Sequence, residues 1–398
     1  GVYIHASYHN HERFTKHKTP NIHPYLIKSI SLIYKVKIMM SSPQKLSFTF
    51  LFLCSTLLTL RVAVTAEIRH RRHHHSHEAV KKLFVFGDSY VDTGNNRKSL
   101  GSSWKDPYGI TFPGKPTGRF SDGRVFTDFL ARSLGLKSPV AYRWRRYIPK
   151  KLKYGMNFAF GGTGVFDTPA PYPNMTTQID FFQQLVHENL FSAYDVKTSV
   201  ALVSLAGNDY AAYLARGGSV QGFQTFITQV VNQLVLDIQR IHSLGVRKTV
   251  VTALEPLGCL PRSTVTNWFQ QCNSTFNQAV SFHNLLLQQG VSKLNSQTHD
   301  HQRSPFMILD LYNAFLSAFK QKWTHSGSTA FNNPLKPCCM GVNQNYSCGN
   351  VDAMGNKLYT VCQDPQSAFF WDSVHPTQAG WHAVSLALEP SLQELHST

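Results

Sequence analysis

The sequence lacks the features of several common classes of protein. It has no Cys-x-x-Cys pair and no suitably spaced histidine to accompany its cysteines, so a structural zinc site is disfavoured. It shows no internal repeat and no second domain boundary, and no aromatic-basic motif accompanies its net charge of +17. A hydrophobic fraction of 42% fits a globular protein. We therefore expect one large globular domain without a metal, a cofactor or a nucleic-acid partner.

A long hydrophobic run is missing as well. The apolar stretch at 46–60 follows Lys45 and is fifteen residues long, which is too short to cross a bilayer comfortably. Small residues suited to cleavage follow at 63–66. The sequence predicts a signal peptide at 39–66, a mature chain from Glu67 without a transmembrane segment, and a probable non-native leader at 1–38. An uncut signal anchor is the alternative, disfavoured because Arg61 interrupts the short run.

Acidic residues are in the minority. After residue 66, 31 Lys and Arg stand against 21 Asp and Glu, a net charge of +10. That charge suits an acidic wall polymer or a membrane surface as well as nucleic acid. Residues 67–82 also hold five histidines, for which we expect a solvated tail because no Cys or acidic ligand has a fixed spacing to them. These histidines are His70, His73, His74, His75 and His77.

Cysteines and glycosylation motifs fit a secreted chain. Once Cys54 leaves with the signal peptide, six cysteines remain: Cys259, Cys272, Cys338, Cys339, Cys348 and Cys362. An even number implies disulfides, and we expect Cys259 to pair with Cys272 and the other four among themselves. Three sequons would be exposed glycan acceptors in the secretory pathway: Asn174, Asn273 and Asn345. The expected location is extracellular, in the apoplast or cell wall.

Short apolar runs alternate with longer amphipathic ones from residue 83 onwards. Strands are predicted at 83–86, 154–160, 200–205, 249–254 and 306–311. Helices are predicted at 124–134, 175–190, 220–244, 272–294, 312–323 and 376–392. This alternation predicts one parallel sheet covered on both faces, in a domain at 83–392 followed by a tail at 393–398.

A serine follows the first predicted strand, where ligands bind in open α/β sheets. Ser89 needs a base to take its proton, and the best candidate is His375 with Asp372 to orient its ring. Because Pro376 is favoured at the first helical position, we expect His375 at the N-cap of the last helix, where the positive helix end keeps the imidazole neutral. Taken alone, Ser89 could be a helix cap and the Asp-x-x-His-Pro run an ordinary helix start.

Acyl transfer also needs hydrogen-bond donors for the oxyanion. Gly161 and Gly162 follow one predicted strand, and Asn208 follows another. Glycines in such places are usually turn formers, and Gly-Asn-Asp is an ordinary turn sequence. In combination, the candidate residues are much more specific than each alone, because four strand-end loops each offer a different part of one mechanism.

These blocks resemble the plant GDSL esterase/lipases, members of the SGNH hydrolases, over residues 83 to about 388. The resemblance lies in Phe-Gly-Asp-Ser at 86–89, Asp-Thr-Gly-Asn-Asn at 92–96, the glycines of 157–164, Gly-Asn-Asp at 207–209 and Asp-x-x-His-Pro at 372–376. It also covers 120–124, 256–261 and the cysteine pair at 338–339, for which no chemical role can be derived. Tyr90 stands where the family has its name-giving leucine.

The resemblance implies a three-layer, flavodoxin-like α/β/α sandwich with about five parallel strands. It implies Ser89 as nucleophile, His375 as base and Asp372 as its orienting acid. The backbone N–H groups of Ser89 and Gly162 and the Asn208 side chain would form the oxyanion hole. An ordinary α/β-hydrolase is disfavoured, since Val91 stands where its elbow needs a glycine.

The sequence therefore predicts a secreted serine esterase or lipase that cleaves carboxylic esters through an acyl-enzyme. A polysaccharide acetylesterase is the alternative among enzymes, and it would account for the basic surface. A binding protein that kept the scaffold is the non-catalytic alternative, against which the intact Ser89, Asp372 and His375 argue. The ester could belong to a lipid, a polyester or an acetylated sugar.

Overall fold

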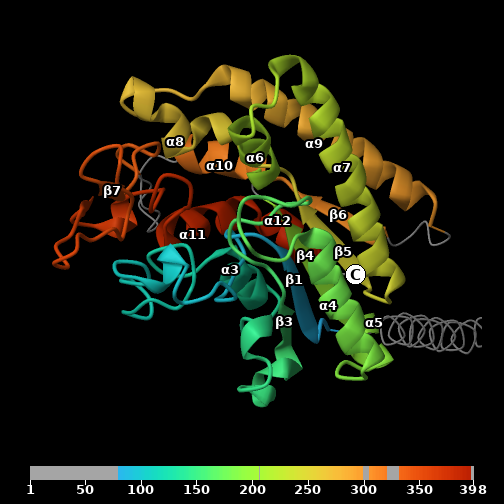
Figure 1. Cartoon of the computed structure of the whole chain (residues 1–398). Helices are drawn as coiled ribbons and strands as arrows, with labels where there is room; N and C mark the ends of the chain where they lie inside the picture. Colours follow the sequence, from blue (N-terminus) through green and yellow to red (C-terminus); the bar gives the residue numbers. More distant parts are fainter. Residues whose placement is uncertain (1–78, 206, 299–303, 321–330, 396–398) are drawn as a thin grey trace, which may run out of the picture. The chain divides into compact units, whose positions relative to one another are not determined.

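The computed structural model describes residues 79–205, 207–298, 304–320 and 331–395 (Figure 1). At its centre lies a sheet of six parallel strands in the order β2-β3-β1-β4-β5-β6. The strands are β1 (Lys82–Gly87), β2 (Val140–Ala141), β3 (Gly155–Asn157), β4 (Ser199–Ser204), β5 (Lys248–Thr252) and β6 (Phe306–Leu309). The sequence predicted five of them. It missed β2, whose two residues are too few to show a period.

Strand β1 lies in the middle of the sheet, hydrogen-bonded to β3 on one side and to β4 on the other. Its residues 83–86 are fully buried, as expected for a parallel strand with both faces covered. Phe84 packs against Phe182 with ring centroids 4.6 Å apart. Because β1 is central, the turn after it opens at the middle of the sheet's carboxyl edge.

Two layers of helices cover the sheet. In one layer α4, α7 and α9 pack side by side, and in the other α3, α10, α11 and α12 do so (Figure 1). The first layer comprises α4 (Met175–His187), α7 (Val220–Ser243) and α9 (Ser274–Ser296). The second comprises α3 (Phe126–Ser133), α10 (Leu311–Lys320), α11 (Gln378–Ala387) and α12 (Glu389–Glu394). The predicted parallel sheet between two helical layers is confirmed.

Within the described ranges, three short helices lie outside the predicted set, and one predicted helix is divided. The additional helices are α5 (Ala193–Lys197), α6 (Asn208–Ala215) and α8 (Pro261–Thr264). The helix predicted at 376–392 is two helices that meet at Leu388. Pro390 explains the division, because it has no N–H to continue the hydrogen bonding of α11.

Disulfides hold two regions near the carboxyl edge of the sheet. Cys259 pairs with Cys272, as the sequence predicted. The other four cysteines pair among themselves, Cys338 with Cys362 and Cys339 with Cys348. These two disulfides lie in and next to a small antiparallel sheet of β7 (Cys339–Gly341) and β8 (Tyr359–Val361). With all six sulfurs in disulfides, none is available as a zinc-binding thiolate.

The predicted leader and signal peptide, and nearly all of the histidine-rich tail, lie outside the described residues. Among the helices that the structure describes, none combines the length and apolar character needed to cross a bilayer.

Candidate active site

Ser89 lies in the turn after β1, with only 6% of its surface exposed. The turn begins at Gly87, whose φ is 140°, and a Cβ there would lie 1.8 Å from the carbonyl oxygen of Ser204. Gln178 of α4 accepts a hydrogen bond from the Gly87 N–H (2.8 Å) and donates one to its carbonyl (2.9 Å). These contacts set the point at which the chain leaves the sheet and so position the serine.

The structure brings His375 and Asp372 to this serine from the far end of the chain. His375 Nε2 lies 2.8 Å from Ser89 Oγ. Its Nδ1 lies 2.9 and 2.8 Å from the two carboxylate oxygens of Asp372. All three distances are those of hydrogen bonds, so the groups form one continuous chain from carboxylate to hydroxyl.

The prediction that His375 caps the last helix is wrong. The cap of α11 is Thr377, whose Oγ1 accepts a hydrogen bond from the Gly380 N–H at 2.9 Å. Pro376 lies outside the helix, in an isolated bridge with Phe370. A threonine hydroxyl is a favoured cap, so the helix begins at Gln378. The expectation that the helix's positive end acts on the imidazole loses its basis.

The Asp372 carboxylate is surrounded by donors. Oδ1 accepts hydrogen bonds from the N–H groups of Val374 (2.9 Å) and His375 (2.8 Å), and Oδ2 accepts one from the Tyr108 hydroxyl (2.7 Å). Burial raises the pKa of Asp372, but His375 and these hydrogen bonds outweigh it, so the pKa lies below its usual value. Burial and the neighbouring carboxylate raise the pKa of Tyr108 well above its usual value. Asp372 is therefore ionised, and Tyr108 remains a donor to it, at neutral pH.

The two adjacent glycines after β3 differ in their surroundings. The Gly161 N–H donates to Asp92 Oδ2 at 3.1 Å, and a Cβ on Gly161 would lie 2.2 Å from the ring of Phe120. Gly162 has φ at 88°, which favours glycine, and its carbonyl accepts a hydrogen bond from Thr168. The N–H of Gly161 is thus already committed within the fold.

Asn208 lies at the start of a helix rather than in a simple turn. Gly207 precedes it with φ at 79°, and α6 begins at Asn208 itself. The side-chain Nδ2 donates to Asp88 Oδ2 at 2.9 Å and to the Thr163 carbonyl at 3.0 Å. The structure therefore brings Asn208 to the residue before Ser89, with both amide protons in use.

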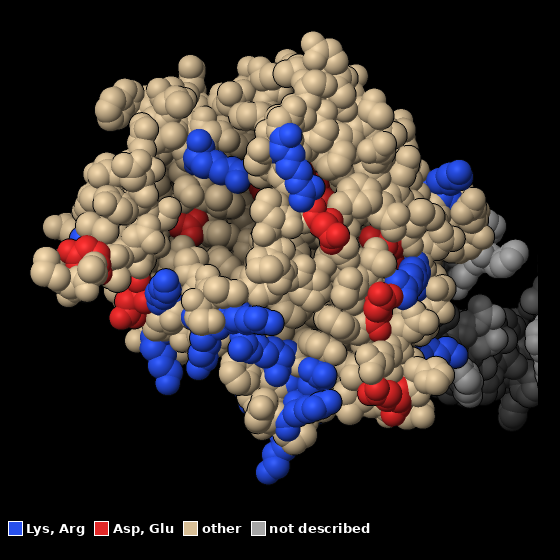
Figure 2. Space-filling view, viewed as in Figure 1, with Lys and Arg blue, Asp and Glu red and all other residues tan. Residues whose placement is uncertain are grey.

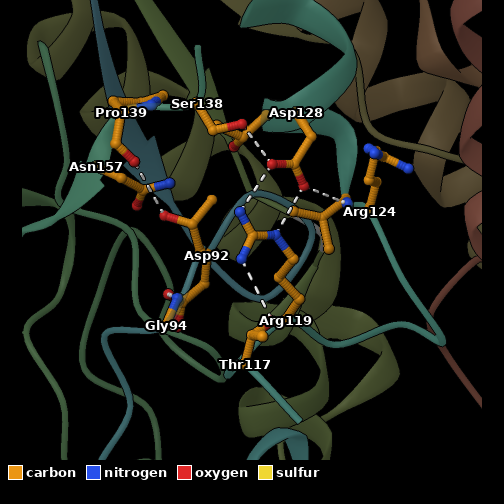
Figure 3. A network of polar contacts seen from close by, with 12 residues as sticks. Asp92, Gly94, Thr117, Arg119, Arg124, Asp128, Ser138, Pro139 and Asn157 are labelled. Atoms are coloured by element: carbon orange, nitrogen blue, oxygen red, sulfur yellow. Dashed lines mark hydrogen bonds and ion pairs between the residues drawn. The ribbon is translucent and has the colours of Figure 1, made fainter. Parts of the chain in front are cut away.

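A buried acidic network supports the turn that carries Ser89. Asp92 Oδ1 accepts hydrogen bonds from the N–H groups of Gly94 and Asn95, each at 2.7 Å. Burial raises the pKa of Asp92 to about 6 in spite of these bonds. Beside it, Arg119 makes two hydrogen bonds of 2.8 Å with Asp128 (Figure 3). This bidentate pair anchors the loop that carries Arg119 to α3.

Sequence reasoning missed the residues that hold the His375 loop. The Ser121 hydroxyl donates to the Pro376 carbonyl at 3.1 Å, and Asp122 Oδ1 accepts from the Gln378 N–H at 2.7 Å. The Phe120 ring lies 5.0 Å from that of His375. The block at 120–124, for which no role could be derived, therefore holds the chain just after His375 and packs against its ring. Its signal in the sequence was the run Phe-Ser-Asp-Gly-Arg, which belongs to the family resemblance.

The family comparison accords with this geometry. Residues 83–388 match the family model described as GDSL-like Lipase/Acylhydrolase. The chain belongs to this family. A GDSL esterase/lipase from Arabidopsis thaliana is 54% identical over 356 residues, which cover 89% of this chain and 98% of the relative. A second from the same plant is 55% identical over 317 residues, covering 79% and 89%. As a GDSL hydrolase, the protein is a carboxylic ester hydrolase.

More distant proteins are also similar to this GDSL hydrolase. Acetylajmalan esterase 2 from Rauvolfia serpentina is 30% identical over 339 residues, covering 79% of this chain and 91% of the relative. The structure of an acetyl xylan esterase from Geobacillus stearothermophilus matches 78% of this chain and 94% of its own at 12% identity, with a TM-score of 0.35. That structural likeness is too loose to bear on the substrate.

The three sequons of this GDSL hydrolase differ in exposure. Asn273 and Asn345 are exposed, as expected, whereas Asn174 is only partly exposed. Asn174 and Asn273 both cap helices, accepting hydrogen bonds from the N–H groups of Thr177 (3.0 Å) and Phe276 (3.1 Å). Asn174 also donates through Nδ2, the atom that would carry a glycan, to Asp167 at 2.8 Å. The expectation of exposure therefore fits two of the three positions.

Proposed function

We propose that this GDSL hydrolase uses Ser89 as nucleophile, His375 as general base and Asp372 to orient the imidazole. Ser89 Oγ attacks the ester carbonyl carbon while His375 Nε2 takes the hydroxyl proton, which then passes to the departing alkoxide. Water next attacks the acyl-enzyme and gives a proton to His375. That proton returns to Ser89 Oγ as the acid leaves. These steps need no metal or cofactor.

One observation carries this proposal. The 2.8 Å contact between Ser89 Oγ and His375 Nε2, continued by two contacts from Nδ1 to Asp372, gives a proton path from hydroxyl to imidazole. The low pKa of Asp372 supports it, because a carboxylate that stays charged stabilises the imidazolium formed in each half-reaction. A binding protein without activity would have no need of this alignment.

For the oxyanion we propose the N–H groups of Ser89 and Gly162 together with Asn208 Nδ2. Gly162 is preferred over Gly161 because the Gly161 N–H is bonded to Asp92. Asn208 must give up one of its present hydrogen bonds to serve this purpose. The bond to the Thr163 carbonyl is the better candidate, since the bond to Asp88 would keep the amide beside the serine.

The test is Ser89→Ala, assayed with a nitrophenyl ester. We expect turnover to fall at least about a thousandfold, because the nucleophile is lost, with an almost unchanged thermal midpoint. Ser133→Ala is the control: it removes the same hydroxyl group, but one that donates to the Leu130 carbonyl within α3. Activity of Ser89→Ala close to that of the control would rule out Ser89 as the nucleophile.

We propose further that the enzyme is secreted, as the predicted signal peptide indicates. Three disulfides support this, since such bonds persist in oxidising compartments. Secretion predicts glycans at Asn273 and Asn345, and at Asn174 after release of its bond to Asp167. Expression with its leader, followed by mass spectrometry of the secreted protein with and without deglycosylation, tests both points. An intracellular, unmodified product would contradict them.

A basic region of the surface supports the proposal that the substrate is an ester group on an acidic wall polymer. Residues 97–153, here called the basic lobe, contain 14 Lys and Arg but only three Asp and no Glu. Two of those three, Asp122 and Asp128, are buried. The rest of 79–398 has 14 Lys and Arg against 16 Asp and Glu. Figure 2 shows basic side chains gathered beside the central hollow, over segments coloured cyan to green in Figure 1.

The basic lobe also forms one wall of the site. Tyr108 binds Asp372, and Phe120 lies against His375. A polyanion held on the lobe would thus place its ester groups next to Ser89. We therefore propose polysaccharide acetylesterase activity on an acidic polymer as the more specific form of the function.

A further inference from the structure

Tyr90, next to the nucleophile, is tied to the loop that carries the histidine. It is 1% exposed, and its hydroxyl donates to the carbonyl oxygen of Val374 at 3.0 Å. Its ring meets that of His375 at a centroid distance of 6.0 Å and that of Trp381 at 5.0 Å. The leucine of the family's name could fill this space but could not make the hydrogen bond. Tyr90 therefore links the serine's turn to the residue just before His375.

Glu255, which follows β5, is buried against Tyr90. It is 1% exposed, and its carboxyl group interacts with the Tyr90 hydroxyl. Within the described part of the chain, the carboxyl atom Oε1 has no hydrogen-bond partner. The titratable and charged groups that face Glu255 are Asp88 and Tyr90 on the β1 turn and Arg262 on α8.

The surroundings of the Glu255 carboxyl group favour its neutral form. Oε1 is buried without a hydrogen-bond partner among the described residues, and a buried carboxylate needs such partners to stay charged. Tyr90 gives its single hydroxyl proton to the Val374 carbonyl. Burial, chiefly, and the charge of Asp88 raise the pKa of Glu255 to about 8, in accord with a neutral acid at neutral pH.

We propose that Tyr90 and protonated Glu255 are positioning residues: the hydrogen bond from Tyr90 to the Val374 carbonyl holds His375 against Ser89, and the neutral Glu255 leaves this bond in place. When Glu255 loses its proton to solvent, the Tyr90 hydroxyl turns to the new carboxylate. The Val374 carbonyl then loses its donor, and the histidine loop loses this tether. The inference rests on the proposed roles of Ser89 and His375.

The test compares pH profiles of kcat and KM for a nitrophenyl ester. In the wild type we expect kcat to fall as the pH rises through about 8. In Glu255→Gln this fall should disappear, because an amide of the same size cannot ionise. Tyr90→Phe should lower kcat about tenfold near neutral pH, the worth of one buried hydrogen bond, with little change in KM and no further fall near pH 8.

Tyr213→Phe is the matched control, because its hydroxyl also donates to a backbone carbonyl, that of Ser219, at 2.8 Å. It should keep the wild-type profile. The proposal would be overturned if kcat of Glu255→Gln fell at alkaline pH as it does in the wild type. It would also be overturned if kcat of Tyr90→Phe equalled that of the control. An inactive wild type, or an active Ser89→Ala, would instead refute the function on which it rests, so the two failures can be told apart.

Discussion

Asn208 must exchange a hydrogen bond before its amide can serve an oxyanion. Both of its Nδ2 protons are used, one by Asp88 and one by Thr163. We expect Asn208→Ala to lower kcat by about a hundredfold to a thousandfold with a small change in KM, because an oxyanion donor acts mainly in the transition state. Steady-state kinetics over a range of ester concentrations measures both constants.

Asn295→Ala provides the matched control for this prediction. The Asn295 amide also donates to a backbone carbonyl, that of Phe306, and accepts from the Phe306 N–H, but at the amino end of β6. Both variants should lose stability, and only Asn208→Ala should lose kcat selectively. A parallel loss of kcat and substrate binding in Asn208→Ala would count against its oxyanion role.

Glu255 also makes stability depend on pH. Its pKa is about 8 in the folded protein and 4.5 ordinarily, so between these values the folded state holds a proton that the unfolded state has released. The free energy of unfolding therefore falls as the pH rises through this window. We expect Glu255→Gln to reduce the drop in thermal midpoint between about pH 5 and pH 8.

Part of that drop should remain in Glu255→Gln, because burial also raises the pKa of Asp92 and of Asp237 to about 6. Glu188→Gln is the control, because it changes an exposed carboxyl group. Its thermal midpoint should fall between about pH 5 and pH 8 as much as that of the wild type. An identical drop in Glu255→Gln and Glu188→Gln would show that Glu255 is not a buried neutral acid.

At the scale of elements, helix α11 holds the loop that carries His375 through its cap. Thr377 is fully buried; its Oγ1 accepts from the Gly380 N–H and donates to the Ala368 carbonyl at 2.7 Å. Thr377→Ala should lower the free energy of unfolding by about 2 kcal/mol, because a buried cap is lost. We also expect a several-fold fall in kcat, since the chain between His375 and the helix loses an anchor. Denaturant titration and kinetics measure the two effects.

Ser219→Ala separates these effects. Ser219 caps α7 in the same way, accepting from the Gly222 N–H at 3.0 Å, but it is exposed and outside the loop that carries His375. It should lose up to about 1 kcal/mol of stability and no activity. If Thr377→Ala lost stability without any loss of kcat, the cap would have no part in placing His375.

At the scale of the whole molecule, charge is concentrated in the basic lobe. We expect the triple substitution Lys150→Glu, Lys151→Glu and Lys153→Glu to weaken binding to polygalacturonate at low salt and to slow deacetylation of acetylated polygalacturonate. Hydrolysis of a nitrophenyl ester should not change, because these exposed side chains act on the polymer at a distance. Pelleting assays and acetate release give the two measurements.

The matched control makes the same change of charge elsewhere, as Lys293→Glu, Lys336→Glu and Lys357→Glu. It should keep both polymer binding and acetate release, since these lysines are exposed but lie outside the basic lobe. Equal losses in the two triple variants would mean that net charge, not the lobe, binds the polymer. If the lobe variant lost binding only to phosphatidylserine vesicles, the lobe would be a membrane surface and the polymer proposal would be wrong.

Local sequence predicted most of the strands and helices of this protein and pointed to the groups proposed to react. Strand β1 follows from a short apolar run that ends at Gly87, and α7 from apolar residues at helical spacing. Ser89, Asp372 and His375 each stand in a block at the end or start of an element, and their combination with Gly162 and Asn208 indicated one site. Each block by itself depends only on neighbours along the chain.

Tertiary structure alone decided how these groups are held. Only the structure shows that the Gly161 N–H donates to Asp92 and that Thr377, not His375, caps α11. It also shows that Tyr108 binds Asp372, which lies 264 positions away in the chain. Tyr90 stood out in the sequence only as a departure from leucine. Its hydrogen-bond acceptor Val374 and its buried neighbour Glu255 come from distant segments, and a contact between such segments leaves no periodicity in either of them.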